Sequence, residues 1–248
     1  MRRVLIVIVI LVLIGLAVLW QAPATLVGSV IEDRSHGRIK LADTTGTIWS
    51  GQGVLVVGDA RVPFGWRAHP TALARGETVV DLVPQPGTDT PRGTVTLRAD
   101  GVSARNLRIT VPAAALASTV SQQPRLAAGG TIDIASEAVD WRRTATSGNV
   151  LAQWRDATVG LAGGPPVALG ELTANLTGQE QRLVGPVRNT GGDVDVSGDV
   201  AIAPDGSAGV FHLLVRPRPN AGTRADAIRS LGPEQGDGVR LDWQWGAR

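Results

Sequence analysis

The sequence predicts a mainly β protein, in which a single N-terminal transmembrane helix precedes a twisted, mostly antiparallel β-sheet domain in two related halves with a few short helices. Three observations support this prediction. An apolar run without charges opens the chain. Apolar and polar residues then alternate with a period of two, which is the spacing of a strand with one buried face. Glycine and proline are abundant, with 31 and 15 of 248 residues, as in short strands joined by turns.

The predicted transmembrane anchor covers residues 4–23. Its first 17 positions, residues 4–20, are apolar and uncharged. At 1.5 Å per residue they span roughly 26 Å, close to the ~30 Å hydrocarbon core of a bilayer, and the next three residues complete the crossing. Because Arg2 and Arg3 precede the run, the positive-inside rule places residues 1–3 in the cytoplasm and residues 24–248 outside it.

A cleaved signal peptide is the competing interpretation of the same segment, with Ala22-Pro23-Ala24 as its small-residue cleavage site. The apolar run is longer than the core of a typical signal peptide, which favours an uncleaved signal-anchor. Both interpretations export the rest of the chain.

Twelve short strands are predicted after the anchor from alternation or from β-branched runs. They are residues 54–57, 78–83, 94–99, 107–111, 131–135, 150–154, 158–161, 171–177, 193–196, 200–203, 210–215 and 240–245. Three short helices are predicted at Pro70–Arg75, Pro112–Val120 and Thr223–Leu231. The segment 84–93 has no apolar residue to anchor it, so we expect an exposed, mobile loop.

A faint internal repeat suggests how the domain is organised. Ser50-Gly51 and Ser147-Gly148 each precede an apolar strand, a turn and a second apolar strand. This echo suggests two related halves, residues 30–111 and 131–248, within the domain that spans residues 24–248.

Composition excludes several classes of function. Arg2 and Arg3 account for the formal charge of +2, so the exported part is neutral and lacks the clustered cations that nucleic acid requires. The absence of cysteine excludes disulfides and thiolate metal sites. No nucleophile elbow, zinc-protease, phosphate-loop or dinucleotide motif occurs. We therefore expect no enzyme, no catalytic, cofactor-binding or metal residues, and no cofactor.

The titratable residues that remain have structural interpretations. His36, His69 and His212 lie in different predicted elements, so we expect them to be structural. Asp193 and Asp195 fall on one face of a predicted strand, and their motif occurs once rather than in tandem. A solvated strand face is therefore favoured over a calcium site.

Two features are candidates for binding. The segment Arg216, Pro217, Arg218 and Pro219 could adopt an extended polyproline-like form and dock a partner, or it could simply be a rigid end to a strand. Six tryptophans follow the anchor, at positions 49, 66, 141, 154, 243 and 245. They are expected to pack in the core, with an apolar groove for acyl chains as the alternative.

Three motifs, taken in order after the anchor, resemble the type II secretion system protein N (GspN) family. They are Gly46–Gly51 (GTIWSG), Gly65–Gly76 with its Trp66, Pro70 and Leu73, and a C-terminal set formed by residues 216–219, 228–233 and 238–243. The resemblance covers essentially the whole chain. It implies a single-pass protein of the cell inner membrane, with a β-rich C-terminal domain in the periplasm and no catalytic residue.

The resemblance also implies a role and partners. The role is that of an accessory, structural component of the apparatus that exports folded proteins across the outer membrane. The partners are other components of that apparatus, namely the secretin and the inner-membrane platform, together with inner-membrane lipid. Neither nucleic acid nor a small-molecule substrate is expected.

The motif Gly46–Gly51 is more distantly similar to the AsmA-like family of envelope proteins. That similarity implies an alternative function in lipid handling or envelope maintenance, with an apolar β-groove. An exported hydrolase is a third, weaker hypothesis.

Overall fold

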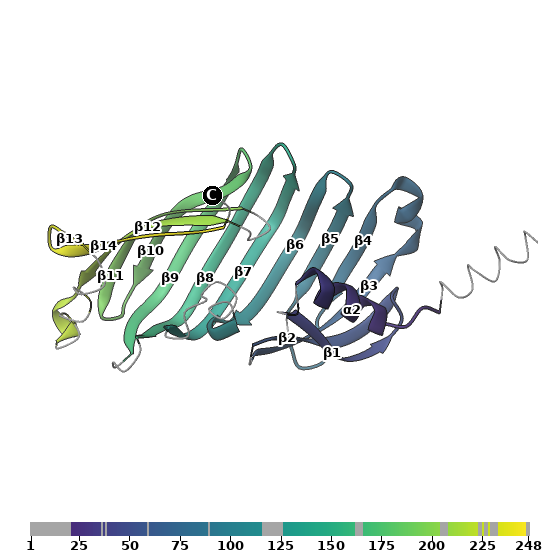
Figure 1. Cartoon of the computed structure of the whole chain (residues 1–248), viewed down its shortest axis with the longest axis horizontal. Helices are drawn as coiled ribbons and strands as arrows, with labels where there is room; N and C mark the ends of the chain where they lie inside the picture. Colours follow the sequence, from purple (N-terminus) through teal and green to yellow (C-terminus); the bar gives the residue numbers. More distant parts are fainter. Residues whose placement is uncertain are drawn as a thin grey trace, which may run out of the picture.

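A 14-stranded antiparallel sheet forms the body of the protein in a computed structural model (Figure 1). The structure describes residues 21–246, apart from residues 36, 38, 59 and 89 and the segments 116–125, 162–165, 204–207, 223–224, 226–227 and 229–232. Strands that are neighbours in sequence are neighbours in the sheet, except that β14 lies between β12 and β13. The prediction of a mainly β, antiparallel fold is thus confirmed.

The long strands β6 to β9 occupy the middle of the sheet, with α2 over β1 at one end (Figure 1). The elements are α2 (Thr25–Arg34), β1 (Ile39–Gly46), β2 (Ser50–Val57), β3 (Ala60–His69), the 3₁₀ helix η1 (Pro70–Arg75), β4 (Thr78–Val83), β5 (Arg92–Arg98), β6 (Gly101–Pro112), β7 (Leu126–Arg142), β8 (Thr146–Leu161), β9 (Val167–Gln179), β10 (Arg182–Thr190), β11 (Val194–Ile202), β12 (Gly209–Pro217), the 3₁₀ helix η2 (Pro219–Ala221), β13 (Glu234–Gln235) and β14 (Gly238–Trp245).

All twelve predicted strands overlap strands of the sheet; β4 has the predicted bounds, and the other strands are longer than predicted. Residues 150–154 and 158–161 belong to one strand, β8, and residues 193–196 and 200–203 to another, β11. The strand β10 was not predicted, because Gly185-Pro186 interrupts its apolar pattern. Proline has no backbone N–H, and the ladder between β9 and β10 assigns no partners to these two residues while pairing continues on both sides of them.

The three predicted helices have different outcomes. Pro70–Arg75 is a 3₁₀ helix that starts with proline and ends at Gly76 in the left-handed conformation. Residues 113–115 are helical, and the remainder of the predicted helix at 112–120 lies outside the described residues or in β6. In the third, only Ala225 and Ile228 are described, both as helical. Helix α2 was not predicted.

Residues 4–20 of the predicted anchor lie outside the described residues. From residue 21 onward, the part of the chain that the structure describes contains no helix long and apolar enough to cross a membrane. Ala22 and Ala24 instead contact the turn between β1 and β2, where the Ala22 carbonyl accepts from the Ile48 N–H (3.0 Å) and the Ala24 N–H donates to the Gly46 carbonyl (3.1 Å).

One continuous sheet spans the junction between the two predicted halves. β6 pairs with β7 from Gly101 opposite Arg142 to Pro112 opposite Thr131. The boundaries 30–111 and 131–248 therefore do not correspond to a break in the sheet, and an evolutionary relation between the halves stays a prediction.

The loop at 84–93 is not the fully exposed segment that was predicted. Gln85 is half-buried, and its side-chain amide donates to the carbonyls of Gly53 (3.3 Å) and Phe64 (3.1 Å). Pro91 is buried. β4 ends at Val83, so Phe64 on β3 has no strand partner on that side and the Gln85 amide satisfies its carbonyl instead.

Candidate functional site

The strand register separates the side chains of the sheet into an apolar face and a polar face. Residues directly opposite each other on antiparallel strands share a face, and alternate residues along a strand share a face. Starting from Leu176 opposite Val150, this rule can be followed across the ladders from β1 to β12 and on to β14. The apolar face comprises residues 39 and 41 of β1, odd residues 51–57 of β2, even residues 62–68 of β3 and 78–82 of β4, odd residues 93–97 of β5, 102, 104 and odd residues 107–111 of β6, even residues 132–136 plus 139 and 141 of β7, even residues 146–154 of β8 and 172–178 of β9, odd residues 183–189 of β10, even residues 194–202 of β11, odd residues 209–217 of β12 and odd residues 239–245 of β14.

No residue in this set is Asp, Glu, Lys, Arg or His. The charged residues of the strands lie on the polar face or in bulges, where they pair with one another across strands. Asp133, for example, accepts from Thr110 (2.6 Å) and forms an ion pair with Arg155 on the next strand. One side of the sheet is therefore uncharged from β1 to β12 and on β14, and Glu234, opposite Val239 on the short edge strand β13, is the exception.

Five of the six tryptophans beyond the anchor project from the apolar face. Trp66 is buried and Trp243 is 43% exposed. The indole N–H groups of Trp66 and Trp154 donate to the carbonyls of Ile48 (3.1 Å) and Gly129 (2.8 Å), so the rings present only their apolar surfaces. The core interpretation holds for Trp66, whereas Trp141, Trp154 and Trp245 are half-buried residues of the face.

The sheet curves toward its apolar face. Leu176, Val187 and Val200 are 2–7% exposed, although every side chain in their cluster comes from the same face of the sheet. Side chains on a flat, uncovered sheet would stay open to solvent, so their burial indicates that β8 to β12 bend toward each other on this face. The apolar face is thus the concave one.

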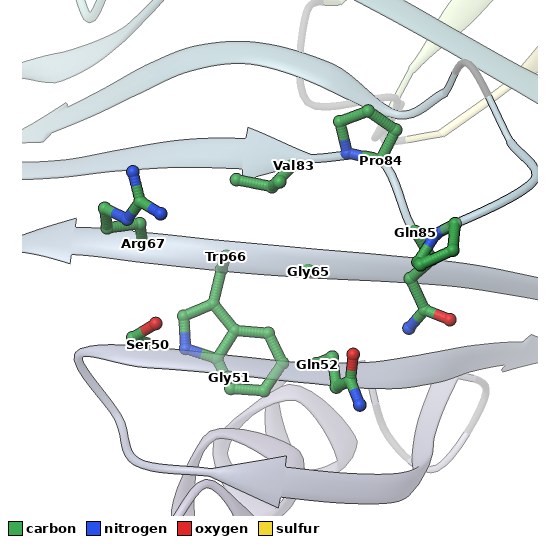
Figure 2. Close-up of a pocket in the computed structure, with 10 residues that line it drawn as sticks. Ser50, Gly51, Gln52, Gly65, Trp66, Arg67, Val83, Pro84 and Gln85 are labelled. Atoms are coloured by element: carbon green, nitrogen blue, oxygen red, sulfur yellow. The ribbon is translucent and has the colours of Figure 1, made fainter.

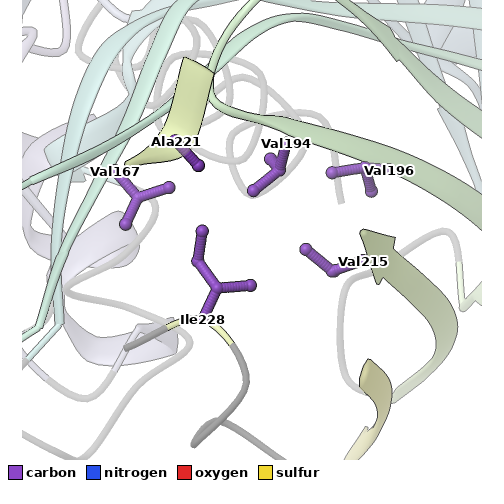
Figure 3. Close-up of a cluster of buried hydrophobic side chains, with 6 residues drawn as sticks. All are labelled: Val167, Val194, Val196, Val215, Ala221 and Ile228. Atoms are coloured by element: carbon purple, nitrogen blue, oxygen red, sulfur yellow. The ribbon is translucent and has the colours of Figure 1, made fainter. Parts of the chain in front are cut away.

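The chain covers the apolar face at both ends. At the C-terminal end, Ile228 and Ala221 pack against Val167, Val194 and the other members of one buried cluster (Figure 3). At the N-terminal end, α2 packs on Leu41, where a β-carbon on Gly28 would lie 3.5 Å from that of Leu41. Between these covers, from β4 to β8, the large apolar side chains of the face are half-buried, or exposed in the case of Leu97.

Two of the sequence motifs meet at an open pocket beside Trp66 (Figure 2). Gly51 and Trp66 are opposite each other on β2 and β3, and a β-carbon on Gly51 would lie 2.5 Å from Cζ2 of the indole. Gln85 and Pro84 complete the rim. The motifs Gly46–Gly51 and Gly65–Gly76 therefore form one packing unit.

The same pairing recurs at the other end of the sheet. Gly209 on β12 is opposite Trp245 on β14, and a β-carbon on Gly209 would overlap the indole ring. Trp245 also stacks on Phe211, with ring centroids 5.2 Å apart. Each end of the apolar face thus carries a tryptophan that lies on a glycine of the neighbouring strand.

The predicted docking segment is bound by the chain's own carboxylates. Arg216 Nε lies 2.7 Å from Asp237 Oδ1, and this hydrogen bond lowers the pKa of Asp237 below its ordinary value. Arg218 Nη2 lies 3.6 Å from Asp195 Oδ1. Pro217 closes β12 opposite Val194. Pro219, the fourth predicted residue, begins η2. Both guanidinium groups remain about one-third exposed.

Two of the three histidines form cross-strand pairs on the polar face. His69 Nε2 lies 2.7 Å from Asp81 Oδ2, and His212 Nδ1 lies 2.7 Å from Asp242 Oδ1. Hydrogen bonds from His69 and then Thr94 lower the pKa of Asp81. The third histidine, His36, lies outside the described residues.

The two aspartates predicted to share a solvated face are separated by the structure. Asp195 lies on the polar face as expected. Asp193 is buried before β11, where its carboxylate accepts from the Ala168 N–H (3.0 Å), because the strand starts only at Val194. Among the described residues, no group of three acidic or histidine side chains is placed to hold a metal ion.

Sequence reasoning offered an apolar groove only as an alternative and did not identify the residues that form the face. Its signal is present as the alternation within each strand, but bulges shift the phase between strands. The register of β5 with β6 slips between Arg92 and Thr94, and that of β7 with β8 slips between Ala135 and Val139.

A family model described as type II secretion system (T2SS), protein N, matches residues 37–241. The chain belongs to this family. No curated protein and no solved structure matches it significantly. The match to protein N runs from just before β1 into β14, so it includes both motifs that meet at Trp66 and confirms the predicted resemblance.

Proposed function

We propose that this member of the protein N family is an accessory inner-membrane component of the type II secretion apparatus, with a structural role in the export of folded proteins across the outer membrane. The observation that supports the proposal is the family match over residues 37–241, which covers nearly the entire sheet. In this proposal the N-terminal segment 4–23 holds the sheet at the periplasmic side of the inner membrane. No catalytic step is part of the role.

The partners would be the secretin and the inner-membrane platform, and the edge of β14 is a surface that could receive one of them. β13 covers β14 only at Gly238 and Val239, and the Arg240 N–H donates to the Pro233 carbonyl (3.0 Å). Residues 241–245 have no neighbouring strand on that side in the described part of the chain. Open edges of this kind accept an extended segment of another protein through backbone hydrogen bonds.

In-cell crosslinking from single cysteines tests the proposal. The chain contains no cysteine, so each introduced thiol is unique. Gln244→Cys places the probe on the β14 edge, and Asn175→Cys places it in the middle of the polar face; both side chains are exposed. The full chain is crosslinked in cells, purified and analysed by mass spectrometry, with the cysteine-free parent as control.

The expected result is that the secretin or a platform protein is crosslinked, and more strongly from position 244 than from position 175. Recovery of no secretion component above the cysteine-free control at either position would reject the proposed role. Equal recovery at both positions would retain the role and reject the β14 edge as its contact surface.

The alternative function in lipid handling depends on what occupies the apolar face. That surface is considered separately below, because a component of the secretion apparatus and a lipid-binding protein are compatible roles for one chain.

A further inference from the structure

We propose that the apolar face between β4 and β8 binds the acyl chains of a phospholipid. This inference does not depend on the proposed role in secretion, because it rests on the charge, shape and covering of one face of the sheet. The part of the face between the two covers is represented by the exposed Leu97 and by the half-buried residues Val95, Ile109, Ile134 and Trp154.

The charge of the face defines the chemistry of the occupant. No charged side chain projects from it on β1 to β12 or on β14, and Glu234, which is opposite Val239, lies on the edge strand β13, far from β4 to β8. Two of its polar groups near the middle are already bonded within the chain, since the Ser136 hydroxyl donates to the Asn149 carbonyl (2.7 Å) and the Trp154 indole to Gly129. A charged or polar ligand would therefore lose hydration and gain few partners, whereas a hydrocarbon chain needs none.

The dimensions of the exposed part suit an acyl chain. Neighbouring strands lie ≈ 4.8 Å apart, so β4 to β8 span roughly 19 Å from the first strand to the last. A phospholipid acyl chain covers about half of the ~30 Å hydrocarbon core of a bilayer, or roughly 15 Å. One chain therefore fits across these strands without reaching the covers at either end.

The covers and the curvature argue against a protein as the occupant. Helix α2 packs on the face at β1, and Ile228 and Ala221 pack on it at β9 to β12. A helix has a diameter of about 10 Å, so a flat partner such as a second sheet cannot lie across both covers and still touch the residues between them. A slender, flexible chain avoids both obstacles.

Site-specific photocrosslinking in the full chain tests the proposal, because the strand register offers matched positions on the two faces. Ile134 and Ala152 are paired on the apolar face, and Ala135 and Leu151 are paired on the polar face one residue away. All four side chains are half-buried. A photoreactive amino acid is introduced at each position in cells whose phospholipids carry ³²P, and the purified chain is examined for labelled adducts.

We expect labelled adducts from positions 134 and 152 at a level at least about tenfold above positions 135 and 151, because neighbouring residues of a strand face opposite sides. Equal labelling from both faces would overturn the proposal, since it would reflect only proximity to the bilayer. A protein adduct from positions 134 and 152, including one to a second copy of this chain, would also overturn it, as would the absence of any adduct there.

A charge on the apolar face provides an independent check. Ile134→Asp should reduce lipid labelling from a probe at Ala152 by at least about tenfold, because a carboxylate is not tolerated beside hydrocarbon. Ala135→Asp is the control on the polar face and should leave that labelling unchanged. Both variants are compared with the parent by limited proteolysis, and a folded Ile134→Asp variant that still labels fully would overturn the proposal.

Discussion

The ring of Trp66 lies against the backbone of Gly51 on the neighbouring strand, in direct register and on the apolar face. The Trp66 indole is held there by its hydrogen bond to the carbonyl of Ile48, which lies in the turn just before β2. Because one residue supplies the ring and the other supplies the space for it, the two motifs that first indicated the family are parts of a single contact. An equivalent pair, Gly209 with Trp245, lies near the opposite end of the sheet.

Gly51→Ala should destabilise the fold by about 1–3 kcal/mol, the usual cost of overpacking a filled site. The added carbon would lie 2.5 Å from the Trp66 ring and 2.7 Å from the Thr45 carbonyl, so the ring or a strand has to move. Urea denaturation followed by tryptophan fluorescence measures the change. Gly160→Ala is the matched control on a strand, where the nearest atom would be 3.4 Å away, and equal losses in the two variants would contradict the explanation.

Asn189→Ala should cost at least about 3 kcal/mol, because three backbone groups lose a partner at about 1–3 kcal/mol each. Its amide donates to the carbonyls of Leu169 (2.6 Å) and Val194 (2.9 Å), and its carbonyl accepts from the Val196 N–H (2.7 Å). The free energy of unfolding checks this value. Asn175→Ala, at an exposed position on β9, should change it by less than about 0.5 kcal/mol.

Replacing both Arg216 and Arg218 by alanine should lower the free energy of unfolding by no more than about 1 kcal/mol, since their ion pairs with Asp195 and Asp237 are exposed to solvent. If the segment also docks a partner, the variant should recover less of the secretion complex than Arg188→Ala, which removes an exposed cation elsewhere on the polar face. Unchanged recovery would leave these arginines with a structural role only.

The pair formed by His212 and Asp242 should make stability depend on pH in the acid range. Hydrogen bonds from His212 and then Arg240 lower the pKa of Asp242 below its ordinary 3.8, so the folded state favours the ionised carboxylate. This stabilisation is complete above 3.8 and is lost as the pH falls through the lowered value. Asp242→Asn should therefore be less stable than the parent near neutral pH, and the difference in urea midpoint should shrink toward about pH 3. A constant difference across that range would contradict the assignment.

The sequence by itself determined which segments extend and to which family the chain belongs. The period of two marks a strand wherever alternate side chains must differ in polarity, and this signal is local, so it identified β4, β6 and β12 without any knowledge of their neighbours. It failed at β10, where Gly185-Pro186 reads as a turn, and at the junctions within β8 and β11, where the apolar pattern lapses inside one strand. These segments stay extended across such breaks because they pair with neighbouring strands. A local sequence pattern contains no information about that pairing.

Only the tertiary structure decided that the apolar residues of thirteen strands, β1 to β12 and β14, form one uncharged face. The face depends on register, and a shift of one residue moves a whole strand's set to the other side. Bulges near Thr94 and Glu137 cause such shifts. The alternation of apolar and polar residues in one strand therefore does not predict which residues of the next strand lie on the same face. The sequence likewise showed Arg216 and Arg218 as free cations, because Asp195 and Asp237 come within reach of them only when β11, β12 and the turn before β14 are side by side.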